Sequence, residues 1–271
     1  MDGELTKIEG FFKEIILTAG SKIREFYIKK NYKILPKADV NDALTTSDIV
    51  SEDFIINKII KKFPKYNILS EEKGFIDNNS EFTFVLDPLD GTKEFIRNIP
   101  DFNVIGGVQY NGEMVLGIVY KPMTEEFFWS RINSGAYLGK RKIHVSKISD
   151  LNKSYIYTII PLLSTKKNIS DLSWKKLSEL NRKVYRMRGM GNTSSAFCLI
   201  AKGSFEGYVN TIGLIKGLWD VGPSIIILKE AGGTISNLQG SIWKPERDLN
   251  KGLIASNGLI HEKLINALEP V

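Results

Sequence analysis

The hydrophobic period of the sequence changes near Pro64, and this change constrains the fold more than any other feature. Before it, apolar residues recur at helical spacing and predict a helix over residues 8–26 and a second one from about residue 48 to Pro64. After it come short β-rich segments, at 66–69, 82–87, 102–109, 113–120 and 126–129. Asn111-Gly112 is a strong hairpin signal between two of them. Residues 1–147 therefore predict helices packed on a largely antiparallel sheet.

From residue 148 onward, strand-like and helix-like segments alternate. The predicted strands are 155–160, 184–187, 207–209 and 252–255, and the predicted helices are 171–181, 193–202, 221–231 and 258–268. Such alternation favours an α/β half over residues 148–271. No flexible linker separates it from residues 1–147, so we expect one tightly packed α+β unit with a functional site at the junction.

Composition narrows the class of protein. The 271 residues hold one cysteine, Cys198, which excludes an internal disulfide framework and fits a reducing cytoplasm. No run approaches the ~18 apolar residues of a membrane span, and no apolar signal region opens the chain. The net charge of +6 comes from lysines scattered along the whole sequence. We therefore expect a cytoplasmic protein with a solvated basic surface, no membrane partner and no nucleic-acid partner.

The stretch FTFVLDPLDGTKEFI, residues 82–96, concentrates the chemistry. Pro88 cannot continue a strand ladder, so the chain must turn at Asp87, and Gly91 permits a tight backbone before the helical segment that follows Thr92. The carboxylates of Asp87 and Asp90 suit a hard cation, whereas the start of a helix suits an anion. Together they suit a metal-bound phosphate ester. A capping turn with solvated aspartates would explain Asp90-Gly91-Thr92 alone.

Three further acids make a capping turn an incomplete explanation. Glu71 follows a short strand in YNILSEE, Asp220 follows a tryptophan in LWD, and Asp48 begins a predicted helix in LTTSD. Asp48 and Asp220 taken alone could simply favour a helix dipole. Four or five carboxylates that converge, however, repel one another and raise their pKa values. We therefore expect divalent metal ions among them.

Other phosphatase chemistries fit less well. A cysteine phosphatase needs an arginine about six residues after its nucleophile, but Ser204 stands there after Cys198, so we expect Cys198 in the core. An aspartyl nucleophile of the haloacid-dehalogenase type needs aspartates two apart, and Asp87 and Asp90 are three apart. His144 and His261 lack metal-ligand spacing and are expected on the surface or in loops. No P-loop or HExxH motif is present.

The motifs YNILSEE, FVLDPLDGTKEF and LWDVGPSIIILKEAGG together resemble the inositol monophosphatase superfamily of Mg²⁺-dependent, lithium-sensitive phosphatases. The resemblance extends from LTTSD to the C-terminal GLIASNGLIHEKLINAL. The DPxDGT element with an upstream glutamate pair and a downstream WD is highly specific. The resemblance implies a layered αβαβα sandwich, the sugar-phosphatase-like fold, which is usually a homodimer.

The resemblance also implies a role for each matching residue. Glu71, Asp87 and the Leu89 carbonyl would hold a first Mg²⁺, and Asp87, Asp90 and Asp220 a second. A third, weaker ion would use Glu71 and waters, and lithium would compete at the weakest position. Thr92 and Asp48, together with Glu71, would activate the attacking water. The remaining contacts, to phosphate oxygens and substrate, are implied for Gly91, Thr92, Gly191, Asn192 and Thr193.

The substrate stays open at this point. We expect a phosphomonoesterase that hydrolyses a small phosphorylated alcohol by attack of a metal-activated water. Lys93, in DGTKEF, resembles the 3′(2′),5′-bisphosphate nucleotidases and also the histidinol-phosphate phosphatases, and could meet a second phosphate or be solvated. The inositol monophosphatases place a glutamate near Asn210 to bind inositol hydroxyls, and the loop that follows is about three residues longer here. An alternative of another class is a regulator associated with RNA or transcription.

Overall fold

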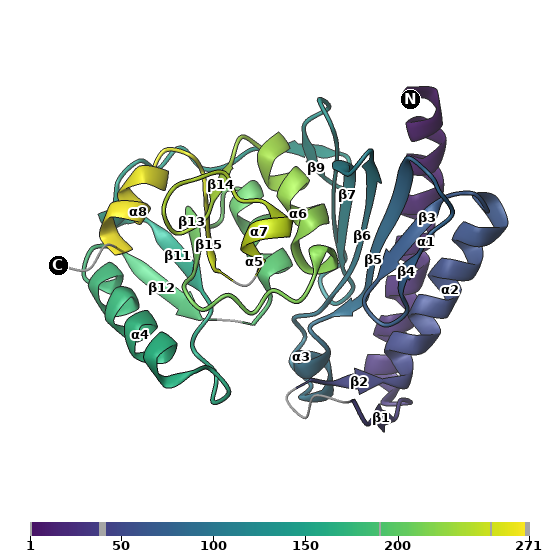
Figure 1. The fold of residues 1–271 in the computed structure, drawn as a ribbon, viewed down its shortest axis with the longest axis horizontal. Coiled ribbons are helices and arrows are strands. Elements are labelled where there is room, and N and C mark those ends of the chain that lie inside the picture. The colour runs from purple at the N-terminus through teal and green to yellow at the C-terminus, as the bar shows by residue number, and fades with distance from the viewer. Residues whose placement is uncertain (1, 38–41, 190, 250, 269–271) are drawn as a thin grey trace.

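The structure is a computed structural model that describes residues 2–37, 42–189, 191–249 and 251–268. Its helices and strands form five layers, which Figure 1 shows from right to left. The first layer holds α1 (Asp2–Lys29) and α2 (Thr46–Lys62). The apolar stripe of α1 that the sequence predicts, including Ile8, Phe12 and Ile16, is fully buried. Both predicted N-terminal helices are confirmed.

The second layer is an eight-stranded sheet in the order β10-β9-β8-β7-β6-β5-β3-β4. Its strands are β3 (Asn67–Ser70), β4 (Gly74–Ile76), β5 (Phe82–Asp90), β6 (Asn103–Tyr110), β7 (Glu113–Lys121), β8 (Glu126–Arg131), β9 (Ala136–Leu138) and β10 (Arg141–Ile143). All pairs are antiparallel except β3 with β5. Asn111 and Gly112 turn between β6 and β7 with φ of 50° and 82°, which confirms the predicted hairpin.

The third layer holds α5 (Thr193–Ala201) and α6 (Leu218–Glu230), which pack against each other and touch both sheets. All residues of α6 from Val221 to Leu228 are buried, because the helix has a sheet on either side. Gly107 and Gly117 face each other on β6 and β7 and form a notch for Pro223 of α6. This close approach fixes where α6 begins.

The fourth layer is a five-stranded sheet in the order β12-β11-β13-β15-β14. Its strands are β11 (Tyr155–Thr158), β12 (Arg186–Gly189), β13 (Gly207–Asn210), β14 (Thr234–Ser236) and β15 (Leu253–Ser256). β11 runs parallel to β12 and β13, as expected of an α/β half, but β15 pairs antiparallel with both its neighbours. The fifth layer holds α4 (Lys167–Asn181) and α8 (His261–Leu268).

Short elements complete the described chain: β1 (Ile34–Leu35), β2 (Leu44–Thr45), α3 (Thr92–Ile96), the 3₁₀ turn η1 (Leu151–Lys153) and α7 (Pro245–Asp248). The layers follow the order helix, sheet, helix, sheet, helix, which confirms the predicted αβαβα sandwich. The division at residues 147 and 148 falls between β10 and η1 and remains a prediction.

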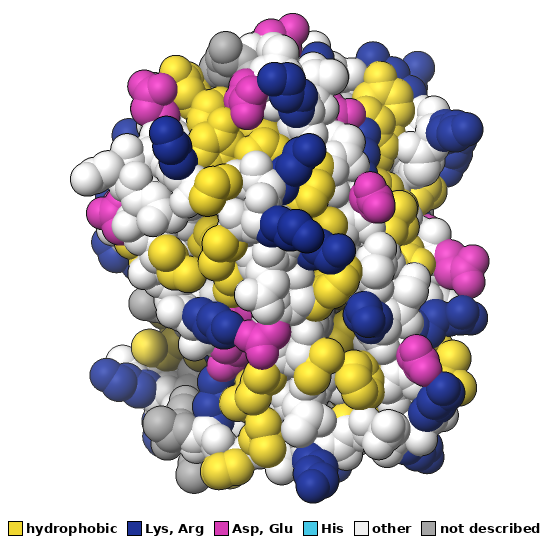
Figure 2. All heavy atoms as spheres, turned by 90° about the vertical axis from the view of Figure 1, so that its right-hand side faces the viewer, with side chains coloured by type: hydrophobic (Ala, Val, Ile, Leu, Met, Phe, Trp, Pro, Cys, Tyr) yellow, Lys and Arg dark blue, Asp and Glu magenta, His cyan; other side chains and the backbone are white. Residues whose placement is uncertain are grey.

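The face formed by α1 and α2 carries a mixed charge. Figure 2 shows its Lys and Arg side chains dispersed among acidic and apolar ones. Ion pairs along α1, such as Lys13–Glu9 at 2.6 Å and Lys29–Glu25 at 2.6 Å, neutralise part of the basic excess there. Within the described ranges, no helix is both long enough and apolar enough to cross a membrane.

Candidate active site

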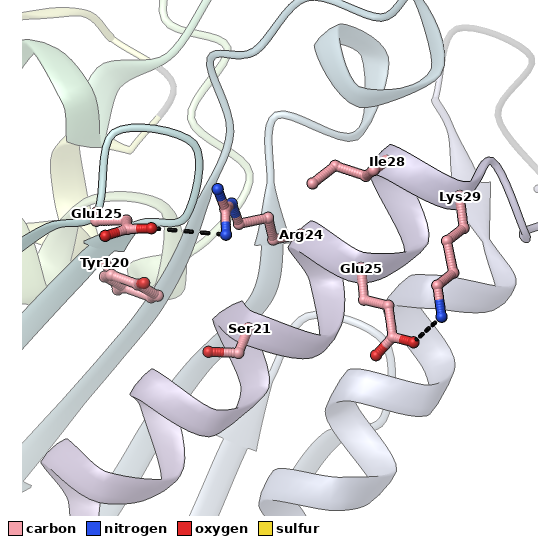
Figure 3. A pocket seen from close by; sticks show the side chains of 7 residues that line it. All are labelled: Ser21, Arg24, Glu25, Ile28, Lys29, Tyr120 and Glu125. Atoms are coloured by element: carbon pink, nitrogen blue, oxygen red, sulfur yellow. Dashed lines mark hydrogen bonds and ion pairs between the residues drawn. The ribbon is translucent and has the colours of Figure 1, made fainter.

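Two cavities of the described chain differ in what lines them. The smaller, of about 300 Å³, runs beside α1 and is lined by Ser21, Arg24, Glu25, Ile28, Lys29, Tyr120 and Glu125 (Figure 3). Its charged side chains pair with one another, Arg24 with Glu125 at 3.5 Å and Lys29 with Glu25 at 2.6 Å. The larger, of about 580 Å³, contains the acids that the sequence predicts and is the candidate active site.

The larger cavity brings together most of the predicted site residues. Those that line it are Glu71, Asp87, Leu89, Asp90, Gly91, Thr92, Lys93, Gly191, Thr193 and Asp220. Residues of the first sheet, of the start of α5 and of α6 therefore meet at one place, although they are up to 149 positions apart in the sequence. Asp48, Asn192 and Asn210 do not line the cavity.

A β-bulge in β5 presents the two aspartates of the DPxD element. The pairing with β6 is regular as far as Asp87 opposite Ile105 and resumes at Asp90 opposite Asn103, so β5 carries one extra residue. Side chains three positions apart in a regular strand point to opposite faces, and one extra residue restores the same face to both. The Leu89 N–H donates to Asp87 Oδ1 at 3.0 Å, which fixes the turn.

Gly91 connects this bulge to α3. Its φ of 94° lies in the left-handed region, and a Cβ there would come within 2.9 Å of the Asp101 carbonyl oxygen. Only glycine satisfies both conditions without strain. Thr92 follows directly, and its Oγ1 lies 2.9 Å from Asp48 Oδ1 and 3.0 Å from the Leu89 carbonyl oxygen. The predicted Thr92–Asp48 pair is therefore in hydrogen-bond contact.

Asp48 stands behind Thr92 and is held by the N-terminus of α2. Its Oδ2 accepts from the Thr45 N–H at 2.8 Å and from the Thr45 hydroxyl at 2.6 Å, leaving Oδ1 for Thr92. Burial raises the pKa of Asp48 to about 6, against the opposing effect of these hydrogen bonds. Thr45 is the N-cap of α2, and nothing in the sequence predicted that it would hold a site residue.

Four carboxylates that the sequence predicts line the cavity, and all four have raised pKa values. Burial raises the pKa of Glu71 and of Asp90 to about 7, and that of Asp87 well above its ordinary value. Mutual repulsion among Glu71, Asp87, Asp90 and Asp220 adds to the effect. Burial is the chief cause of the raised pKa of Asp220. The N–H groups of Lys216 and Gly217 donate to its Oδ2 at 2.7 and 3.3 Å and oppose this effect.

Two lysines bring positive charge to the rim of this cluster. Lys37 Nζ lies 2.7 Å from Glu72, 3.0 Å from Asp42 and 3.7 Å from Glu71. Lys216 Nζ lies 3.5 Å from Glu71 and also pairs with Asp42. Burial lowers the pKa of each lysine, but the acidic partners more than offset this and raise it. These two lysines could not be predicted from the sequence, because isolated lysines in loops carry no motif.

Asp90 connects the cavity to the start of α5. Its Oδ2 accepts from the Asn103 amide at 3.2 Å and from the Ser194 hydroxyl. Asn192, the N-cap of α5, accepts the Ser195 N–H at 3.0 Å and donates to the Asp90 carbonyl oxygen at 3.4 Å. Because Asn192 bonds to both, it holds Asp90 and the start of α5 together. It is buried and does not line the cavity itself.

Asn210, like Asn192, does not line the cavity. It is fully buried, its Oδ1 accepts the N–H groups of Ile212 and Gly213 at 3.1 and 3.0 Å, and its Nδ2 donates to the Gly213 carbonyl. The amide thus shapes the longer loop before α6. No glutamate-like contact to a substrate hydroxyl is offered at this position.

The acids fit metal ions by chemistry rather than by their present positions. As they stand, no three or more of the His, Cys, Asp and Glu side chains in the described ranges converge to hold one ion. Asp90 and Asp220 instead accept hydrogen bonds from Ser194 and from the loop before α6. The donors are nonetheless all oxygens, mutually repelling and shielded from water, which is what hard divalent cations bind.

Cys198 and His261, for which the sequence predicts positions away from the site, both lie outside the cavity. Cys198 is fully buried on α5, as expected of a core residue. The expectation that His261 lies on the surface is wrong. It is buried, because Ser256 and Ser236 lie 2.9 and 2.8 Å from its two ring nitrogens and satisfy both.

Comparison with known proteins decides the family. The sequence model described as "Inositol monophosphatase family" matches residues 4–271. The chain belongs to this family. Among its relatives, the fructose-1,6-bisphosphatase/inositol-1-monophosphatase of Methanocaldococcus jannaschii is 34% identical over 232 residues, covering 86% of this chain and 83% of that protein. The Nus factor SuhB of Pasteurella multocida is 28% identical over 254 residues, covering 93% and 92%.

Solved structures agree with the sequence match. The extragenic suppressor protein suhB from Bartonella henselae superimposes with a TM-score of 0.88 at 27% identity, over 97% of this chain and 98% of that one. The inositol monophosphatase from Anabaena gives a TM-score of 0.81 at 27% identity, over 98% and 96%. These matches confirm the predicted fold and the phosphatase class, in a family that is generally metal-dependent.

Proposed function

We propose that this member of the inositol monophosphatase family is a Mg²⁺-dependent phosphomonoesterase that hydrolyses a small phosphorylated alcohol by attack of water. The observation that carries the proposal is the set of four carboxylates, Glu71, Asp87, Asp90 and Asp220, whose pKa values are all raised around one cavity. Without cations such a cluster would repel an anionic ester. Mg²⁺ is therefore required for binding as well as for reaction.

The chain offers ligands for two or three ions. Glu71, Asp87 and the Leu89 carbonyl would hold the first ion, Asp87, Asp90 and Asp220 the second, and Glu71 with waters a third. When bound, the ions would offset the phosphoryl charge and make a coordinated water more acidic. Li⁺ would compete at the weakest of these positions.

Thr92 and Asp48 would orient and deprotonate the water. The Thr92 hydroxyl donates to Asp48 Oδ1 and so turns its lone pairs toward the cavity, where it can accept a hydrogen bond from water. A proton released there can pass through the hydroxyl to Asp48 Oδ1, since Oδ2 is occupied by Thr45. A carboxylate with a pKa of about 6 is a suitable base near neutral pH.

Lys93 supports a second candidate substrate. This lysine lines the cavity beside Gly91 and Thr92, where a phosphate would lie, and its side chain is exposed. A second phosphate on the substrate would pair with it, as in a 3′(2′),5′-bisphosphate nucleotide. We rank an inositol-monophosphatase-like activity first, this nucleotidase second and a histidinol-phosphate phosphatase third. We also propose a cytoplasmic homodimer.

The test is phosphate release from a panel of esters with Mg²⁺, with and without Li⁺ and with a chelator. Asp90→Asn should lower kcat/KM on every ester by more than about 100-fold, the upper end of what a lost outer partner costs a metal site. Asp171→Asn, an exposed acid on α4, is the matched control and should change nothing. Unchanged turnover in Asp90→Asn refutes the metal assignment.

The relatives named Nus factor SuhB suggest the competing class, a protein that acts on RNA or transcription. RNA affinity that survives Asp90→Asn and falls steeply with salt would favour that class. In that case phosphate release should be absent from the unmodified chain as well.

A further inference from the structure

The cavity is built from two chemically different sets of residues. The acids come from the first sheet and the start of α6, whereas the C-terminal half supplies a set of apolar side chains. We call these the apolar wall: Ile159, Ile160, Leu162, Leu214 and Ile215. They come from two loops, one after β11 and one between β13 and α6. The wall therefore continues directly from the proposed reaction site.

Three members of the apolar wall are unusually exposed for their size. Ile160, Leu162 and Leu214 keep 43%, 45% and 44% of their surface in contact with solvent. Contiguous exposed apolar groups in a concave, polar-rimmed site are typical of ligand contact, because they gain free energy only when something covers them.

Leu214 is also held in a costly backbone conformation. Its φ is 57°, and it is the one apolar residue among the described non-glycine residues with positive φ. A side chain with a Cβ and no local hydrogen bond is strained in this left-handed region. Such conformations persist where the surroundings impose them, and they cluster at ligand sites. Here the conformation keeps a leucine at the cavity surface.

Ser164, two residues after Leu162, is a polar side chain that lines the cavity, whereas two other polar groups of the C-terminal half are engaged within the protein. The Asn210 amide is used inside its own loop, and the Thr193 hydroxyl lies 2.9 Å from the Tyr208 hydroxyl. A polyol presents a hydroxyl on nearly every carbon, and each hydroxyl buried without a partner costs free energy. The wall would leave several of them unsatisfied.

We propose that the substrate is a phosphate monoester whose alcohol part carries an apolar face, either a flat ring or an alkyl chain, that packs on the apolar wall. This inference rests on the proposed function for the phosphate end, and for the alcohol part it favours the ring-bearing nucleotide candidate over the inositol-like ester ranked first above. The volume of about 580 Å³ lies within the range of small-molecule sites and accommodates a phosphate together with such a group.

The test compares esters of three alcohols: benzyl phosphate for a ring, hexyl phosphate for a chain and glycerol 2-phosphate for a polyol. With Mg²⁺, kcat/KM should be at least about tenfold higher for an apolar ester than for glycerol 2-phosphate, as expected for burial of a few apolar carbons. The better of the two apolar esters identifies the ring or the chain. Equal or faster hydrolysis of glycerol 2-phosphate overturns the proposal.

Variants of the wall locate the effect. Leu162→Ser should lower kcat/KM for the apolar ester about tenfold and leave glycerol 2-phosphate unchanged. Leu163→Ser is the matched control, because Leu163 is fully exposed and does not line the cavity. Leu214→Asn removes the apolar group while asparagine tolerates the positive φ, and should act like Leu162→Ser. Equal losses on both esters, or none, overturn the assignment of the wall.

A binding measurement keeps this inference separate from the proposed catalysis. Benzylphosphonate and 2-hydroxyethylphosphonate cannot be hydrolysed, so calorimetry with Mg²⁺ reports affinity alone. Benzylphosphonate should bind about tenfold more tightly, and Leu162→Ser should remove the difference. If no ester is hydrolysed but this preference appears, the proposed function fails and the wall stands. If esters are hydrolysed but the affinities do not differ, the proposed function stands and the assignment of the apolar wall fails.

Discussion

Replacing Gly117 by alanine should move the helix that carries Asp220. A Cβ at Gly117 would lie 2.0 Å from the Pro223 carbonyl oxygen and 2.6 Å from Ile226 Cγ2, both on α6. To go from 2.0 Å to the 3.4 Å of an ordinary contact, α6 must retreat from β7 by about 1.4 Å. The opposing Gly107, whose own Cβ would meet Pro223 at 2.8 Å, shows that no slack exists in the notch.

Two measurements follow from this displacement. Overpacking of this kind costs about 3 kcal/mol in the free energy of unfolding, because α6 is packed on both sides. Thermal unfolding followed by circular dichroism should then show Tm lowered by roughly 6 °C in a chain of this size. Asp220 lies three residues before Pro223, so kcat/KM should fall by about 100-fold, the effect of a misplacement of this order at a reacting centre.

Gly10→Ala is the matched control. Gly10 lies on the exposed side of α1, and a Cβ there would meet nothing within 4 Å. The same substitution should raise stability by about 0.5–1 kcal/mol, through helix propensity alone, and leave kcat/KM unchanged. If Gly117→Ala retains both the Tm and the kcat/KM of the unmodified protein, the notch does not fix the position of α6.

Two further predictions concern pH. Thr45→Val removes the hydroxyl that donates to Asp48 Oδ2, so the pKa of Asp48 should rise above about 6. The acid limb of the pH profile of kcat/KM should then move to higher pH. A profile that does not move contradicts the role of Asp48 as base. The metal-free protein should become less stable as pH rises from about 4.5 to 7. The raised pKa values of Glu71 and Asp90, each about 7, mean that the folded state binds more protons than the unfolded state in this window. Melting curves in chelator should therefore show Tm falling with pH and Mg²⁺ restoring it most at pH 8, and a Tm that rises instead would contradict the raised pKa values of Glu71 and Asp90.

Structural features that depend on residues adjacent in the sequence could be predicted from it. Features that depend on contacts between distant residues could not. The Asn111-Gly112 hairpin, the first two helices and the DPxDGT turn are local patterns, and each is present. Lys216 approaches Glu71 from 145 positions away, so nothing near either residue signals the contact.

His261 shows the same limit in a single side chain. Its immediate neighbours are typical of an exposed helix start, yet Ser236 and Ser256 arrive from β14 and β15 and satisfy both ring nitrogens. The one-residue bulge of β5 could be predicted only in part. Pro88 marks the place where the ladder fails, but only the pairing with β6 shows that Asp87 and Asp90 return to one face.

The position of α6 between two sheets has a consequence for how the chain is made. Until Val221 and Ile225 are synthesised, the face of the first sheet that includes Ile105, Val119 and Phe128 lacks most of its cover, because α6 packs on this sheet far more extensively than α5 does. About 90 residues separate the end of β8 at Arg131 from the start of α6 at Leu218, and for that interval the growing chain carries an apolar face that can bind other chains. Asp220, the last of the four acids, arrives on the same helix. The synthesis of α6 therefore supplies the last acid of the cavity and most of the cover of this apolar face together.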